Sequence, residues 1–246
     1  MNYDYKEGRN RVISILKSEK NVKTLDRVPT IGKFTYENSF YSNVTALFVD
    51  IKDSTNLFGK HRHESTSKII RAFTSEILEI LNYGDNLREI GIRGDCVYAI
   101  YTYSLKEENY EIAKRAFYIN TYLKMLNKML LEKNMDTITA GIGVATSKEL
   151  VIKAGKEGTK ISNLVWIGEA VTHASKFSGI AGRDISDPII FSNSFYNSVA
   201  NQFNSCKTLY DMSKPRKRHK AKNLGGYHSC DIKVKDFNEW IDGGMK

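Results

Sequence analysis

Residues 46–58 read Ala-Leu-Phe-Val-Asp-Ile-Lys-Asp-Ser-Thr-Asn-Leu-Phe, an apolar run that ends on a carboxylate and continues into a polar turn. Such a run predicts a strand buried on both faces, so its end is a rigid place to hold Asp50. Asp53, Ser54 and Thr55 follow as an N-cap cluster, and the free N–H groups of a helix N-terminus bind phosphate. A carboxylate for a metal ion beside a seat for phosphate indicates nucleotide chemistry, although a plain helix cap explains the same residues.

A second stretch, residues 88–101, has a β-rich run on each side of Arg93-Gly94-Asp95, which predicts a tight hairpin. Asp95 then stands at a strand end, as Asp50 does, and neighbouring strands would bring the two carboxylates together. Paired carboxylates repel unless a cation lies between them, and Mg²⁺ or Mn²⁺ takes oxygen ligands of this kind. Turn chemistry alone also accounts for Gly94 and Asp95.

The composition of the chain limits its class. It has 246 residues and a formal net charge of +9, and no run approaches the roughly 20 apolar residues of a membrane span. The N-terminus has no signal-peptide pattern, and the three scattered cysteines favour a reducing cytosol. We therefore expect a cytoplasmic protein with no membrane partner. The basic run at 214–222 is interpreted as a solvated connection more readily than as a nucleic-acid arm, because no aromatic residues are interleaved with its charges.

Hydrophobic periodicity predicts a ferredoxin-like α+β core. Its expected elements are a strand at 44–51, a helix at 56–83, a hairpin at 86–101, a helix at 107–133 and a strand at 137–145. The order strand, helix, strand, strand, helix, strand is the split βαβ arrangement. Gly141 and Gly143 lie inside the last of these strands, where glycine marks close approach by a ligand or another backbone.

Shorter elements are expected on both sides of this core. A modest helix at 7–19 and a connector at 20–43 precede it, so residues 1–41 form an N-terminal segment and 42–246 the catalytic domain. A C-terminal αβ extension follows, with strands at 149–155, 160–167 and 188–191, helices at 168–180 and 192–202, and a last strand near 226–234. We expect one domain overall, since no repeat or low-complexity linker interrupts it.

Four motifs, in order, resemble those of the class III nucleotide cyclases. The strand ending at Asp50 is similar to their first metal motif, and Gly94-Asp95 to their second. The strand with Gly141 and Gly143 is similar to the one that follows their second helix. The segment Trp-Ile-Gly-Glu-Ala-Val-Thr-His-Ala-Ser-Lys at 166–176 resembles their last signature. The resemblance covers about residues 42–182.

The resemblance implies a concrete mechanism. Asp50 and Asp95, with the carbonyl of Ile51, would hold two Mg²⁺ or Mn²⁺ ions, while the backbone around residues 51–55 cradles the phosphates. The ribose 3′-hydroxyl would attack the α-phosphorus, and pyrophosphate would leave. Members of the family are usually antiparallel homodimers with active sites at the shared interface.

The chain also departs from the family. Thr172 stands where an asparagine usually positions the ribose, and Lys176 stands where an arginine usually stabilises charge on the α-phosphate. Lysine keeps the positive charge without the bidentate fork of arginine. The two positions that read a purine base hold Gly91 and Val165, whose side chains cannot hydrogen-bond a base edge.

The missing purine readers make the chain similar to a bacterial branch of the family, the Pycsar cyclases. Those enzymes convert UTP or CTP to cyclic UMP or cyclic CMP, an alarm in anti-phage defence that activates a separate effector protein. Arg93, Trp166 and Tyr98 are the candidates for contacts near the base, and Trp166 is explained equally well as a core residue.

Three other functions remain open. The first is an adenylate or guanylate cyclase that reads its base with other residues. The second is a diguanylate cyclase, against which Cys96-Val97 argues, because a metal carboxylate would be missing after the hairpin. The third is a catalytically silent domain that binds a nucleotide or nucleic acid through the basic run at 214–222, with binding that falls steeply as salt rises.

Overall fold

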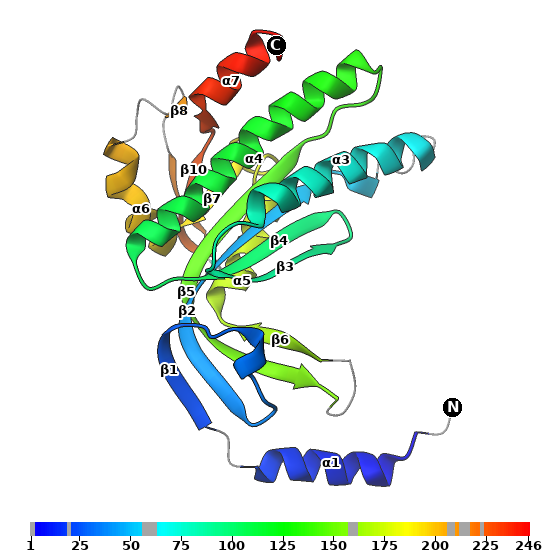
Figure 1. Ribbon diagram of the computed structural model, residues 1–246, viewed down its shortest axis with the longest axis vertical. Coiled ribbons are helices and arrows are strands. Elements are labelled where there is room, and N and C mark those ends of the chain that lie inside the picture. Colours follow the sequence, from blue (N-terminus) through cyan, green and yellow to red (C-terminus); the bar gives the residue numbers. More distant parts are fainter. Residues whose placement is uncertain are drawn as a thin grey trace.

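The structure is a computed structural model, and it describes residues 3–18, 21–55, 63–156, 162–205, 210–211, 217–221 and 224–246. Its core runs β2 (Asn38–Ile51), α3 (His63–Leu81), β3 (Leu87–Arg93), β4 (Cys96–Thr102), α4 (Lys106–Glu132) and β5 (Ala140–Gly155). The strands lie in the order β3-β4-β2-β5, and each neighbouring pair is antiparallel (Figure 1). The predicted ferredoxin-like α+β fold is therefore confirmed.

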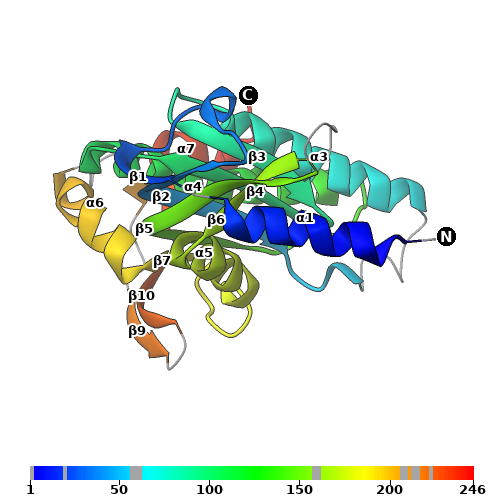
Figure 2. The same ribbon diagram turned by 90° about the horizontal axis from the view of Figure 1, so that it is seen from below.

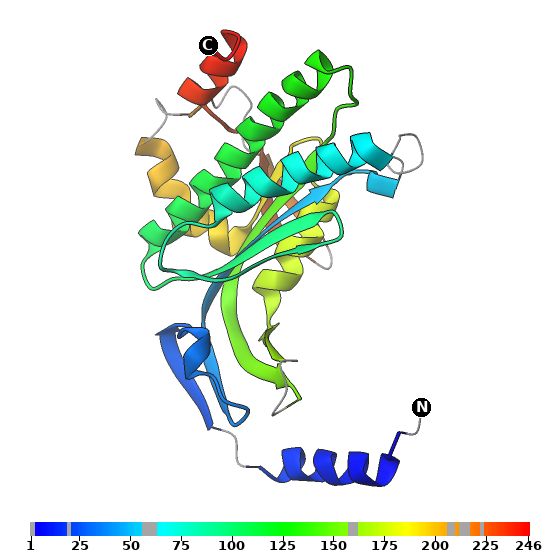
Figure 3. The same ribbon diagram turned by 45° about the vertical axis from the view of Figure 1, so that its right-hand side comes forward.

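Alternate residues of β2 face opposite sides of the sheet, because side chains alternate along a strand. Leu47, Val49 and Ile51 are buried in the core beneath α3 and α4. Phe48 belongs to the second core, on the other side of the sheet, with residues of α5 (Glu169–Ile180). Figure 3 shows α3 and α4 together on one side of the strands. By the same alternation, Asp50 shares the α5 side of the sheet with Phe48.

Two glycines let α5 lie directly on β5. A Cβ atom at Gly141 would come within 2.1 Å of the Ser178 carbonyl oxygen, and one at Gly143 within 2.1 Å of the Ala174 carbonyl oxygen. Backbone atoms cannot yield to such contacts. The predicted close approach at these glycines is thus to a helix backbone, and it sets how closely α5 lies on β5.

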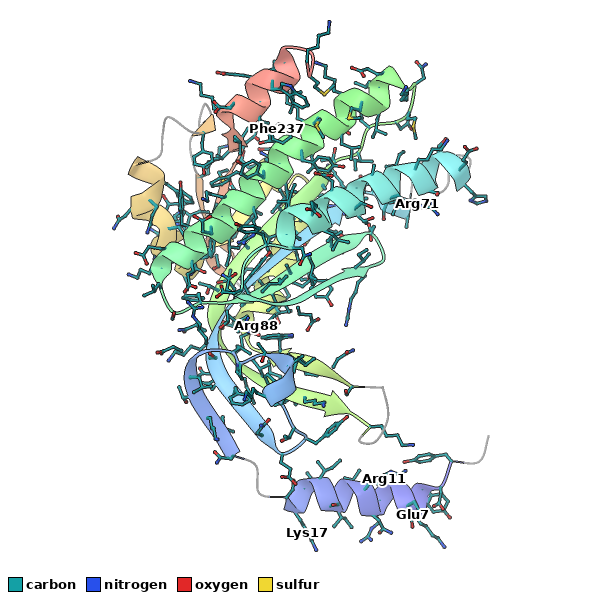
Figure 4. All side chains as sticks on the ribbon, viewed as in Figure 1. Glu7, Arg11, Lys17, Arg71, Arg88 and Phe237 are labelled. Carbon is teal, nitrogen blue, oxygen red and sulfur yellow. The ribbon has the colours of Figure 1, made fainter. Side chains whose placement is uncertain are left out.

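The expected connector at 20–43 contains regular structure instead. It holds β1 (Asn21–Arg27), which pairs in parallel with the first half of β2, and the 3₁₀ helix η1 (Ile31–Lys33). Arg88 of β3, at the junction of the sheet and this segment in Figure 4, donates a 2.6 Å hydrogen bond from Nε to the Val28 carbonyl. β2 begins six residues earlier than predicted because its first residues pair with β1. The boundary predicted between residues 41 and 42 falls within β2, and the division into domains stays a prediction.

The N-terminal helix α1 (Tyr5–Lys17) forms as predicted. Asp4 caps it, since its side chain accepts hydrogen bonds from the backbone N–H groups of Lys6 and Glu7. In Figures 1 and 3 the helix lies beyond the ends of β1, β2, β5 and β6 (Ser162–Ile167), away from α3 and α4. Figure 2, seen from below, shows it on the near side of these strands.

The extension differs from expectation in three places. The two strands predicted at 137–145 and 149–155 are one strand, β5. Part of the basic run at 214–222 is not a connection but the edge strand β9 (Lys217–Ala221), and the rest of the run lies outside the described residues. The last strand is divided into β10 (Gly225–Cys230) and β11 (Lys233–Val234), and an unexpected helix, α7 (Lys235–Asp242), follows.

The remaining elements agree with the predicted order. They are β6 (Ser162–Ile167), β7 (Ile189–Ser192) and α6 (Asn193–Ser205). The two-residue strand β8 (Tyr210–Asp211), which pairs with β11, was not expected. β6 pairs with the far half of β5, β7 runs parallel to the near half, and β10 and β9 extend the sheet beyond β7. Among the helices that the structure describes, none is both long and apolar enough to span a bilayer.

Candidate active site

The two predicted metal ligands lie at one end of the central strands. Asp50 pairs with Cys96 across β2 and β4, and Asp95 directly precedes Cys96 in the hairpin turn, where Gly94 takes a left-handed φ of 61°. Burial raises the pKa of Asp50 above its ordinary value, the negative charge of Asp95 raises this pKa further, and Arg183 opposes both effects. Burial and the two carboxylates raise the pKa of the Cys96 thiol to about 12, so it stays protonated. The carboxylates are close enough to repel, as paired metal ligands do.

Arg183 lies against the same oxygen atoms. Its Nη1 donates to the Asp50 carboxylate at 3.2 Å, and its Nη2 donates to the Ile51 carbonyl at 2.8 Å. The side chains of Asp50 and Arg183 are 23% and 29% exposed. The carboxylate of Asp50 and the carbonyl of Ile51 therefore both accept hydrogen bonds from one guanidinium cation.

The donor set suits a hard divalent ion. Within the described residues, no group of three or more His, Cys, Asp or Glu side chains could hold a metal ion. Two carboxylates and a backbone carbonyl are oxygen ligands of the kind that Mg²⁺ and Mn²⁺ prefer, with substrate phosphates and water completing the shell. Asp50, Asp95 and Ile51 are the residues that would hold such an ion.

The segment predicted to bind phosphate follows β2 directly. Asp53 has a φ of 53°, a left-handed conformation that turns the chain, and Ser54 and Thr55 begin a helical turn. Residues 56–62 lie outside the described residues, so the start of the predicted helix at 56–83 is seen only from His63 onward. The phosphate role of Asp53, Ser54 and Thr55 stays a prediction.

A cavity of about 550 Å³ opens beside α5 on the same side of the sheet. It brings together most of the remaining predicted residues, which come from β3, β4, β6 and α5. Its lining includes Phe48, Glu89, Arg93, Tyr98, Val165, Trp166, Thr172 and Lys176. The candidates for base, ribose and α-phosphate contacts therefore share one cavity, next to the Asp50 and Asp95 pair.

Gly91 lies beneath the ring of Tyr98. A Cβ atom at Gly91 would come within 2.8 Å of the Tyr98 hydroxyl and within 3.0 Å of its ring. The ring stacks on Phe48, with centroids 5.2 Å apart and planes 16° apart. The position to which the resemblance assigns purine reading is thus covered by the ring of Tyr98, which a side chain larger than glycine would displace.

Glu89 joins the two walls of the cavity. It accepts a 2.8 Å hydrogen bond from the Tyr98 hydroxyl and a 2.7 Å hydrogen bond from the Trp166 indole. Burial and the Glu89 carboxylate raise the pKa of Tyr98, which keeps the phenol protonated as a donor. Trp166 packs against the second core, which is one of its two expected roles, and its indole also holds Glu89 in place. Its stacking on a base stays a prediction.

α5 carries the two residues expected at the ribose and the α-phosphate. Thr172 and Lys176 are exposed toward the cavity, and the Thr172 hydroxyl donates a 3.2 Å hydrogen bond to the Gly168 carbonyl. Glu149 of β5 caps the helix, because its Oε1 accepts from the Ala170 N–H at 2.6 Å. The buried carboxylate therefore fixes the start of the helix that presents Thr172 and Lys176.

Sequence reasoning missed four residues of this region: Phe48, Glu89, Glu149 and Arg183. A signal existed for Glu89, because residues 89, 91 and 93 lie on one face of a strand. No comparable signal existed for Arg183, which contacts Asp50 across 133 residues of chain.

The fold and the site define a class of protein. A ferredoxin-like sheet with paired carboxylates at one strand end, beside a cavity under a helix that carries a lysine, has the architecture of a nucleotide cyclase catalytic domain. Residues 36–212 match the family model for the adenylate and guanylate cyclase catalytic domain. The chain belongs to this family, the class III nucleotide cyclases, and is a phosphorus–oxygen lyase. Domains of this class use divalent metal ions.

Named relatives and solved structures agree with this assignment. The chain is 46% identical to a uridylate cyclase of Treponema porcinum over 247 residues, which cover 100% of this chain and 83% of the relative. It is 33% identical to a uridylate cyclase of Gulbenkiania mobilis over 76% of each chain. The crystal structure of the guanylyl cyclase Cya2 superposes with a TM-score of 0.62 at 14% identity, covering 79% of this chain and 93% of that one.

Proposed function

We propose that this cyclase converts UTP to cyclic UMP and pyrophosphate, with CTP as the alternative pyrimidine substrate. The observation that carries the proposal is the ring of Tyr98, which covers Gly91 and stacks on Phe48. A bulky side chain over the purine-reading position leaves less room for the second ring of adenine or guanine. The uridylate cyclase names of the similar proteins support the same substrate.

The polar groups of the cavity suit uracil better than cytosine. Uracil presents an N3–H donor beside the O4 acceptor, whereas cytosine has a bare N3 beside an amino group. Glu89 is an acceptor held in place by two donors, and Arg93, at the same cavity, only donates. An acceptor for N3–H with a donor for O4 would favour UTP.

The reaction is an intramolecular phosphoryl transfer. The ribose 3′-hydroxyl gives up its proton to solvent and its oxygen forms a bond to the α-phosphorus. The bond from the α-phosphorus to the bridging oxygen breaks, and pyrophosphate leaves with the electron pair. Lys176 would place positive charge beside the α-phosphate as negative charge builds on its oxygens. The Thr172 hydroxyl would orient the ribose, and residues 53–55 would bind phosphate oxygens.

We further propose that Asp50, Asp95 and the Ile51 carbonyl hold two divalent cations, Mn²⁺ or Mg²⁺. Bound there, such ions neutralise the triphosphate and lower the pKa of the 3′-hydroxyl. Without a bound ion, burial and the negative charge of Asp95 raise the pKa of Asp50, and a cation at the pair would offset both effects.

The active form is proposed to be a homodimer. The cavity is open, and exposed apolar side chains lie on β6 at its wall: Val165, which lines the cavity, is 39% exposed, and Ile167 is 49% exposed. A second copy that covers this side would bury them and would bring its own Asp50 and Asp95 toward Lys176. Two half-sites on one chain, completed by a partner, match the family's antiparallel dimer.

The biological role is proposed by resemblance. A cytoplasmic cyclase that makes cyclic UMP would supply the alarm of a Pycsar-type anti-phage system, and a separate effector protein would respond to it without a stable complex. If so, phage protection by the chain and its effector should disappear with Asp50→Asn.

The direct test of the activity is incubation of the purified protein with UTP and Mn²⁺, with products identified by mass spectrometry. Cyclic UMP from the wild type, and none from Asp50→Asn or Asp95→Asn with unchanged circular dichroism, is the expected result. Normal turnover by either variant would remove that aspartate from the metal site. A cyclic product from ATP or GTP alone would agree with cyclase activity and would refute the assignment of a pyrimidine substrate.

A further inference from the structure

Arg183 is held at the metal ligands by three hydrogen bonds. Besides its contacts to Asp50 and Ile51, its Nη1 donates to the Gly179 carbonyl at 2.7 Å. The guanidinium thus binds the same carboxylate and the same backbone carbonyl that the metal site requires. Arginine carries its charge at all accessible pH values, so this is a fixed cation at the site.

The turn after α5 builds this contact. Gly182 has a φ of 67°, its N–H donates to the Asp187 carbonyl at 3.0 Å, and the Arg183 N–H donates to the Ile180 carbonyl at 3.1 Å. Lys52, the residue after Ile51, donates from Nζ to the Gly182 carbonyl at 2.8 Å. The turn that carries Arg183 is therefore closed by its own backbone hydrogen bonds, to which Lys52 adds one contact, and the guanidinium is fixed by its own three acceptors.

We propose that Arg183 is the resident counter-cation of this metal site, and that a divalent ion enters by displacing its guanidinium from Asp50 and Ile51. The guanidinium and a divalent ion compete for the same oxygen atoms, and like charges a few ångströms apart repel strongly in a partly buried site. The inference rests on the proposed role of Asp50 and Ile51 as metal ligands.

This exchange has a consequence for metal affinity. In the metal-free protein, Arg183 offsets the charge of the aspartate pair, so the site is stable without a metal ion. Binding of the ion must overcome the lost Arg183 contacts, each a charge-assisted hydrogen bond. Arg183 therefore raises the metal concentration at which the cyclase becomes active, and it sets a threshold for metal occupancy.

The test is Mn²⁺ binding by the full chain without nucleotide, with free Mn²⁺ measured by electron paramagnetic resonance. Arg183→Met removes the charge and keeps the length, and Arg183→Lys keeps the charge without the fork. Lys52→Met is the matched control, because it removes a neighbouring positive charge that contacts Gly182 and not Asp50. Thermal unfolding of each variant checks that it is folded.

We expect Arg183→Met to bind Mn²⁺ about tenfold more tightly than the wild type, with Arg183→Lys between them and Lys52→Met within about twofold of the wild type. The added affinity should vanish in Arg183→Met/Asp50→Asn. Equal, weaker or absent binding by Arg183→Met, or an equal gain in Lys52→Met, would overturn the proposal. Product formation from UTP by the wild type is measured separately, so a negative result in the Mn²⁺-binding test does not refute the proposed cyclase activity.

Discussion

Glu89 lies two residues before Gly91, on the face of β3 that lines the cavity, and two donors hold its carboxylate. A carboxylate accepts about four hydrogen bonds, so the donors Tyr98 and Trp166 leave some lone pairs of the Glu89 oxygen atoms unused. It is therefore both fixed and available, which is the condition for reading a base edge with selectivity.

Glu89→Gln should weaken the preference for UTP over CTP. The amide can donate to the bare N3 of cytosine and accepts less strongly from the N3–H of uracil. We expect the ratio of kcat/KM for UTP to that for CTP to fall by roughly 10-fold or more. Steady-state rates with each nucleotide measure it, and Glu79→Gln, on an exposed face of α3, is the control. An unchanged ratio would show that Glu89 does not read the base.

Tyr98→Ala should relax the exclusion of purines. Its ring occupies the space above Gly91 and stacks on Phe48, so its removal opens room for a second ring. We expect the rate with ATP or GTP, relative to UTP, to rise by about tenfold. Tyr98→Phe keeps the ring and should keep the exclusion. If Tyr98→Phe and Tyr98→Ala exclude purines equally, another residue limits the size of the base.

At the scale of elements, α5 is the part that links the fold to the site. Gly141 and Gly143 let its backbone rest on β5, and Glu149 caps its N-terminus. Burial raises the pKa of Glu149, and among the described residues its Oε2 has no hydrogen-bond partner. The cap therefore depends on the protonation state of one buried carboxyl group.

Stability should depend on pH through Glu149. Because its pKa in the folded protein is raised above the ordinary 4.5, the protonated form stabilises the fold. That stabilisation is complete below the unfolded pKa and is lost as pH rises through the folded pKa. Urea unfolding from about pH 4 to pH 7.5 should show a smaller decline in the free energy of unfolding for Glu149→Gln than for the wild type. Parallel declines would contradict this role.

Much of this element pattern could be predicted from the sequence, because strong hydrophobic periodicity marks β2, the hairpin and both long helices. The break predicted within β5 was wrong for a physical reason. Residues 146–148 are polar, and yet Thr146 is buried and donates a 2.8 Å hydrogen bond to the Val44 carbonyl. Pairing with β2 satisfies this polar group, so tertiary context overrides the local pattern.

The site was predictable to the extent that it lies in local motifs. Asp50 and Asp95 each end a recognisable strand, and their closeness follows from the pairing of β2 with β4. Arg183 and Trp166 contact their partners, Asp50 and Glu89, only through folding over long stretches of chain. A local pattern in one sequence does not predict contacts between residues so far apart in the chain.

At the scale of the molecule, the central prediction concerns the dimer. Asp50→Asn and Lys176→Met should each inactivate the enzyme as homodimers. The two variants are co-expressed with different tags, and the mixed dimer is purified through both tags. One of its two sites carries neither substitution, so we expect about half of the wild-type activity per dimer. No recovery in a mixed dimer of confirmed composition would mean that each chain builds its site alone.

The most direct test of this account is a single reaction with UTP, CTP, ATP and GTP at equal concentrations, with Mn²⁺ and mass detection of all four cyclic products. The account predicts that cyclic UMP predominates, with cyclic CMP as the minor product and the purine products far below both. A predominance of cyclic AMP or cyclic GMP would contradict the role assigned to Tyr98 over Gly91.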